Sequence, residues 1–155
     1  MADYSGVWQK LHSFVINQED RDILYLLIHN KLSIPERLHR IKVRRNPYCL
    51  SCPNTVCDVV HYFCLCCKTE RCWSWLKLKI FHYCPSQISD WDLLNLFIPN
   101  TPFLKEILWM IGIYVSYAWR AIEKGNKGLC VEKFFGFLSF KYKEDINLLS
   151  DRFNI

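Results

Sequence analysis

Apolar residues recur at every third or fourth position through most of the chain, interrupted by short polar or proline-containing breaks. This spacing places apolar side chains on one face of a helix, so it predicts amphipathic helices. We therefore expect a mainly α fold with short connections. The predicted helices cover residues 5–15, 19–32, 35–43, 69–81, 89–97 and 101–124, with aromatic-rich or short helical stretches at 131–140 and 146–153.

Helix start signals agree with several of these boundaries. Residues 33–36 read Ser-Ile-Pro-Glu, a capping box with proline in the first turn. Ser89 is a predicted N-cap, and Thr101 is another, with Pro102 at the first helical position. Three acids near residue 20 lie where a helix dipole favours negative charge.

The same pattern predicts which side chains form the core. The helix from residue 19 is apolar almost all round in its middle, so we expect it to be central. Leu38 and Ile41 are predicted to face inward from the next helix. Further core positions are predicted at Ile23, Leu24, Leu26, Leu27, Ile28, Leu32, Trp73, Trp75, Leu76, Leu78 and Ile80.

Composition narrows the class of protein. At 155 residues, with 51% hydrophobic residues, 15% aromatic residues and only five glycines, the chain suits one folded domain and not a disordered segment. The longest uncharged apolar run, Ile107 to Trp119, is shorter than the roughly 20 residues that span a bilayer. The first residues do not resemble a secretion leader. We expect no membrane partner and an intracellular location, with nucleus and cytoplasm undistinguished.

Cysteines gather in one window. Residues 47–72 hold seven of the nine cysteines together with His61. In a reducing compartment such clustering indicates a metal more often than disulfides, and Zn²⁺ is the metal expected for cysteine and histidine ligands. We therefore expect one domain over 1–155, made of N-terminal helices (1–45), a zinc knuckle with at most a short hairpin (46–72) and C-terminal helices (73–155).

The spacing leaves two ligand sets open. Cys49-x2-Cys52 is the tight turn by which a backbone offers two thiolates to one zinc. The second pair is either His61-x4-Cys66, which gives a site of three cysteines and one histidine, or Cys64-x2-Cys67, which gives an all-cysteine site.

Positive charge concentrates around the same window. The net charge is +5, but residues 31–79 hold ten Lys/Arg and three acids, a net of +7, so the rest of the chain carries −2. A basic zone of this kind favours contact with the phosphates of RNA or DNA, although a solvated helix face is the ordinary alternative. The candidate contacts are Arg37, Arg40, Lys42, Arg44, Arg45, Lys68 and Arg71.

A series of motifs resembles a known family. In order they are Trp8…Leu11, Leu26 to Leu32 (LLIHNKL), Pro35 to Leu38 (PERL), Cys49-Leu50-Ser51-Cys52, His61 to Cys66 (HYFCLC), Trp73, and Trp75-Leu76. They are similar to the W…L, LLHNRLPTxERL, CxxC, HLFxxC and W..L motifs of the zinc-binding domain C-terminal to the reverse transcriptase of non-LTR (LINE-type) retrotransposons. About the first half of the chain is covered closely, and Trp109 to Trp119 looks like the Y…W helix that often follows.

The resemblance implies the ligand set Cys49, Cys52, His61 and Cys66. The chain departs from the family pattern at Pro53, where a glycine is usual, and in its additional cysteines. It also implies an accessory module of a retroelement reverse transcriptase that binds template or target RNA or DNA, with a reverse transcriptase domain as a further partner.

No catalysis is expected from this chain alone. The sequence has no Tyr-x-Asp-Asp carboxylate pair for nucleotidyl transfer, no P-loop and no Ser/His/Asp order. The alternative functions are a structural or protein-interaction module, or an inactive element remnant, with no nucleic-acid binding of its own. The sequence gives no oligomeric state.

Overall fold

The computed structural model describes residues 18–84, 87–99, 101–125, 128–129, 131–134 and 136, and it is mainly helical, as predicted. The predicted helices over 5–15 and 146–153 lie outside the described residues, as does most of the stretch 131–140. The elements are α2 (Gln18–Ile28), α3 (Pro35–Arg40), the π-helix η1 (His61–Leu65), α4 (Glu70–Tyr83), α5 (Asp90–Leu94) and α6 (Leu104–Gly125).

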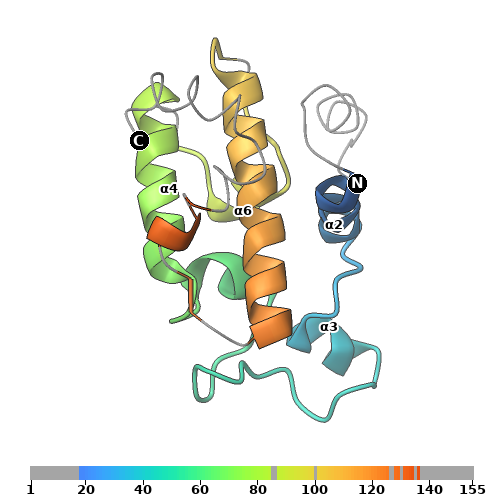
Figure 1. Cartoon of the computed structure of the whole chain (residues 1–155). Helices are drawn as coiled ribbons and strands as arrows, with labels where there is room; N and C mark the ends of the chain where they lie inside the picture. Colours follow the sequence, from blue (N-terminus) through green and yellow to red (C-terminus); the bar gives the residue numbers. More distant parts are fainter. Residues whose placement is uncertain are drawn as a thin grey trace.

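Helix α6 is the centre of the arrangement. In Figure 1 it stands between α4 and α2 and runs in the direction opposite to α4. Its C-terminal end lies beside α3, and the long loop after α3 passes beneath it. Within the described ranges, no helix combines the length and the apolarity needed to cross a bilayer.

A buried ion pair joins α2 to α6. Asp20 is completely buried, and its carboxylate accepts a hydrogen bond from the Ser116 hydroxyl and forms an ion pair with the Arg120 guanidinium at 3.0 Å. Arg120 also contacts the exposed Glu19 carboxylate at 3.0 Å. Asp20 therefore does more than complement the helix dipole, because it fixes α2 against α6 through a paired charge.

Aromatic side chains fill the space between α4 and α6. The Trp73 and Tyr114 rings lie 5.2 Å apart between centroids. Phe134, from the described part of the C-terminal stretch, is fully buried and packs against Tyr114 at 5.8 Å and Tyr117 at 5.6 Å. Large rings account for much of the apolar area that a core of this size buries.

Two predicted caps differ from the structure. Helix α3 has Ile34 as its N-cap and no side-chain cap, so the capping-box interpretation of residues 33–36 is wrong. The Glu36 N–H instead donates to the Cys57 carbonyl at 3.1 Å, and this tertiary contact replaces a local cap. Helix α6 begins at Leu104, later than predicted, so the predicted N-cap Thr101 lies before its first turn. Ser89, in contrast, caps α5 as predicted, accepting from the Asp92 N–H at 3.2 Å.

Three predicted core residues are exposed. Leu26 and Leu78 lie on the outer faces of α2 and α4, because each helix packs along one face only. Ile41 follows the end of α3, where Lys42 adopts a positive φ of 64° and turns the chain outward. Leu24, Leu27, Ile28, Leu32, Trp73, Leu76 and Ile80 are buried as predicted.

Candidate metal centre

A short hairpin carries the first two predicted ligands. Tyr48 and Val56 form an antiparallel bridge, flanked by hydrogen bonds from the Cys49 N–H to the Thr55 carbonyl and from the Cys57 N–H to the Pro47 carbonyl, both 2.8 Å. Between the paired residues the chain reverses and presents Cys49 and Cys52 on the same loop. The prediction of a knuckle with at most a short hairpin agrees with this geometry.

The π-helix η1 carries His61, and Cys66 follows it directly. The Asp58 carboxylate accepts the His61 N–H at 2.8 Å, and the Cys66 N–H donates to the His61 carbonyl at 2.8 Å. In an α-helix, residues five apart point about 140° away from each other. The wider π turn reduces this angle and brings Cys66 over His61. Such turns occur frequently at functional sites.

Helix α6 holds η1 in place. The Tyr114 hydroxyl donates to the Phe63 carbonyl, and the Tyr62 hydroxyl donates to the Glu123 carboxylate at 2.8 Å. The Tyr62 ring also packs against Trp119, with centroids 5.5 Å apart. The position of two candidate ligands is therefore set by contacts 51 to 61 residues away in the sequence.

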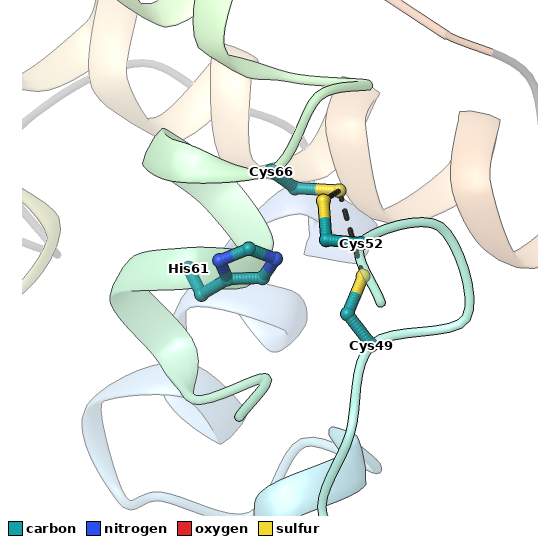
Figure 2. Close-up of side chains that lie close together, drawn as sticks. All are labelled: Cys49, Cys52, His61 and Cys66. Atoms are coloured by element: carbon teal, nitrogen blue, oxygen red, sulfur yellow. Dashed lines mark hydrogen bonds between the residues drawn. The ribbon is translucent and has the colours of Figure 1, made fainter. Parts of the chain in front are cut away.

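The four predicted ligands converge. Their ligand atoms all lie within 4.8 Å of one another, and Figure 2 shows the four side chains around one point. The Cys66 Sγ lies 3.7 Å from the Cys49 Sγ and 3.9 Å from the Cys52 Sγ. A tetrahedral zinc with bonds of about 2.3 Å to sulfur separates its sulfurs by about 3.8 Å. The group Cys49, Cys52, His61 and Cys66 could therefore hold a metal ion.

The histidine supports this interpretation independently. The His61 Nε2 is buried and has no hydrogen-bond partner within the described part of the chain. In Figure 2 one ring nitrogen points toward the cysteine sulfurs. Because buried polar atoms are nearly always bonded, an orphaned imidazole nitrogen beside three thiols fits a metal ligand.

Backbone N–H groups surround the sulfurs. The Ser51 N–H donates to the Cys49 Sγ at 3.4 Å, and the Cys67 N–H donates to the Cys52 Sγ at 3.5 Å. Burial acts to raise the pKa of Cys49, but the polar groups around its sulfur, the Ser51 N–H first and then the His61 imidazole and the Cys52 N–H, outweigh it, and the net pKa is lowered. Hydrogen bonds of this kind orient thiolate ligands and stabilise their charge.

Cys66 shows why a cation suits the group. Burial, together with the neighbouring Cys49 and Cys52 sulfurs, raises the pKa of Cys66 to about 12. Adjacent thiolates repel one another, so the cluster disfavours full ionisation without positive charge. A bound divalent cation reverses that balance and deprotonates its thiol ligands.

The alternative pair is not part of the group. Cys64 is 2% exposed in the helical core, where burial raises the pKa of its thiol. Cys67 is exposed, and its Sγ lies 3.7 Å from the Ser51 carbonyl. Among the described residues, the metal-competent group includes neither of them, and none of the eight described cysteines forms a disulfide.

The basic residues take different positions. Arg44 lies against the hairpin, where its Nη2 donates to the Tyr48 carbonyl at 3.0 Å. Arg44 and Lys68 line one pocket of about 400 Å³, whose wall also includes Cys49 and Cys66. Of the other five candidates, Arg37 is half-buried, and the exposed ones are Arg40, Lys42, Arg45 and Arg71.

Some positioning residues were not found from the sequence. Asp58 stands three residues before His61, an N-cap spacing that could have identified it. Tyr114 and Glu123 act on η1 through tertiary contacts, for which the sequence contains no local signal.

No protein-family model matches the chain, and neither the search of curated proteins nor that of solved structures found a match. The motif resemblance therefore stays a prediction.

Proposed function

We propose that this chain is a zinc-stabilised accessory module of a retroelement reverse transcriptase that binds RNA or DNA through the basic surface beside its metal centre. One observation carries the proposal. Arg44, before the hairpin, and Lys68, just after the last candidate ligand, line the same pocket as Cys49 and Cys66. A metal bound by the four ligands would fix both cations in relation to each other.

Zinc is the metal that the donor set favours. Three thiols and one imidazole suit a tetrahedral, redox-inert site with all positions filled by protein. Such closed sites are structural and lack the open position that a catalytic zinc uses for water. We therefore propose that the metal has a structural role and organises the binding surface.

Arginine and lysine contribute differently to phosphate recognition. The Arg44 guanidinium has five N–H donors in a planar fork, and the Tyr48 carbonyl, which accepts from Nη2, orients it. Because the hairpin that would bind the metal also carries Tyr48, metal binding is coupled to the orientation of the Arg44 side chain. Loss of the metal should loosen Arg44 together with the hairpin.

Binding to RNA and DNA oligonucleotides across a salt series tests the proposal. Fluorescence anisotropy on zinc-loaded protein should show log Kobs falling linearly with log salt, with a slope of about −3 to −5 for four to seven phosphate contacts on a single strand. Absent or salt-insensitive binding by folded, zinc-loaded protein contradicts the proposal.

A matched pair of charge reversals locates the surface. Arg45→Glu changes an exposed residue beside the hairpin. Lys105→Glu changes an exposed residue in the first turn of α6, at the end of that helix opposite to the pocket residues Ile122 and Glu123. We expect Arg45→Glu to weaken binding and to reduce the salt slope by about one contact, while Lys105→Glu leaves both unchanged. Equal effects of the two variants would place the binding surface elsewhere.

A second candidate is a protein-interaction module, favoured by exposed apolar residues around the hairpin. The knuckle and the loop before it expose Ile41 (48%), Val43 (69%), Tyr48 (44%), Leu50 (81%), Val56 (47%) and Leu65 (55%). Large exposed apolar patches often mark interfaces. This candidate, with a reverse transcriptase domain as the natural partner, predicts that Arg45→Glu leaves partner binding intact and Leu50→Asp abolishes it.

A further inference from the structure

The pocket that Arg44 and Lys68 share extends beyond the metal centre. Its volume, about 400 Å³, lies within the range of small-ligand sites, and it is bounded by the α3 region, the hairpin, η1 and the end of α6. Its apolar lining includes Leu38, Tyr62 and Ile122. An apolar lining of this kind suits a flat aromatic group.

The polar lining has both signs of charge. Arg44 and Lys68 supply cations, and Glu123 supplies a carboxylate. Glu123 is held in place, because its Oε1 accepts the Tyr62 hydroxyl at 2.8 Å. An ionised carboxylate has about four acceptor positions, so this bond leaves capacity for a ligand that presents N–H donors.

We infer that this pocket binds one unpaired nucleotide, with guanine preferred. The assignment rests on the proposed nucleic-acid binding and names its ligand. The phosphate meets Arg44 and Lys68, the base lies against the apolar lining, and its edge donates to Glu123. Guanine offers two adjacent donors, N1–H and the N2 amino group, which match the two oxygens of a carboxylate.

Other bases fit this arrangement less well. Cytosine and adenine offer an amino donor beside a ring acceptor, so each meets the carboxylate with one bond only. Uracil and thymine have a single N–H between two carbonyl oxygens. These oxygens would lie beside the carboxylate oxygens and repel them. Single-stranded segments are the natural source of such a base, because their Watson–Crick edges are open to protein groups.

The test uses the zinc-loaded 155-residue chain and two RNA octamers, one all uridine and one with a single central guanosine. We expect the guanosine octamer to bind about tenfold more tightly, as expected for one bidentate base contact. Glu123→Gln should bring the two affinities within about twofold without changing the salt slope. The Tyr62 hydroxyl can still donate to the glutamine oxygen, so this variant should fold.

The matched control is Glu132→Gln, which makes the same change at an exposed position that is not among the pocket residues. It should preserve the tenfold preference. Calorimetric titration with guanosine and uridine monophosphates should show the same order without a polymer. Equal, salt-sensitive binding of both octamers by the wild type overturns the nucleotide pocket and leaves the proposed function standing. Absence of binding to either octamer overturns the proposed function itself.

Discussion

At the scale of single residues, the chemistry of the candidate centre depends on which side chains would lose a proton when a metal binds. Three thiols and an imidazole nitrogen lie within 4.8 Å of one another, with Ser51 and Cys67 N–H groups donating to two of the sulfurs. Neutral imidazole and thiolate are the binding forms, so metal uptake releases protons. Each ligand position can be tested by itself.

Substitution of a ligand should release the metal. We expect His61→Ala and Cys49→Ser to lower zinc affinity by more than about 100-fold, beyond the 10- to 100-fold typical of residues that only support ligands. Competition with a chromogenic chelator measures this. Cys67→Ser is the control, because Cys67 is an exposed cysteine next to the candidate ligand Cys66 and outside the group. If Cys67→Ser released zinc and His61→Ala did not, the assigned ligand set would be wrong.

The buried ion pair between α2 and α6 gives a second prediction. Replacing Arg120 by alanine removes the cation that contacts the fully buried Asp20 carboxylate at 3.0 Å, which should lower the free energy of unfolding by about 3–5 kcal/mol. Glu19→Ala removes the other carboxylate that contacts Arg120, but this one is exposed and should cost no more than about 1 kcal/mol. Urea unfolding measures both. Equal costs would mean that the buried pair has no special role.

At the scale of elements, η1 connects the metal centre to the helical core. It provides His61 directly and ends at the residue before Cys66, while its Phe63 carbonyl accepts the Tyr114 hydroxyl of α6. Two ligands therefore depend on a segment of five residues whose shape is held from outside. This explains why a short, locally unfavourable π turn persists here.

Removing the hydrogen bond from the Tyr114 hydroxyl to the Phe63 carbonyl should affect both stability and metal binding. Tyr114→Phe leaves the Phe63 carbonyl buried without its donor, which should cost about 1–3 kcal/mol of unfolding free energy. Zinc affinity should fall by about tenfold, because η1 becomes less fixed. Tyr25→Phe makes the same change at a side chain that is 48% exposed and should alter neither property appreciably. An unchanged zinc affinity in Tyr114→Phe would mean that the knuckle positions its ligands without α6.

Local signals were sufficient for most elements and insufficient for their contacts. Helical periodicity predicted α2, α4, α5 and α6, and the motif resemblance implied the four ligands that the structure brings together. The α3 cap was mispredicted because its N-terminal donor bonds the Cys57 carbonyl, a contact between distant residues. Leu26 and Leu78 were mispredicted because periodicity shows that a helix is apolar, but not how much of it a neighbour covers.

At the scale of the whole molecule, the candidate metal centre joins the helical core through η1, but most of that core consists of other residues. The core between α2, α4 and α6 is built from buried side chains such as Leu27, Trp73 and Tyr114, none of which is a candidate ligand. The hairpin, in contrast, has one β-bridge within the described residues and several exposed apolar side chains. We therefore expect the metal to stabilise the two regions unequally.

Zinc removal should leave a helical but less stable protein. If zinc is present at about 1,000 times its dissociation constant, binding contributes about 4 kcal/mol, which for a domain of this size corresponds to a Tm lower by roughly 10 °C after chelation. Far-UV circular dichroism at 20 °C should keep most of its helical signal. Limited proteolysis should cut the metal-depleted protein first within residues 46–57, because the hairpin loses the contacts that join it to η1. His61→Ala provides the control, since chelator should not lower its Tm further. Complete loss of helical signal on chelation would show that the core itself requires the metal, and an unchanged Tm would show that the four-residue group does not bind it.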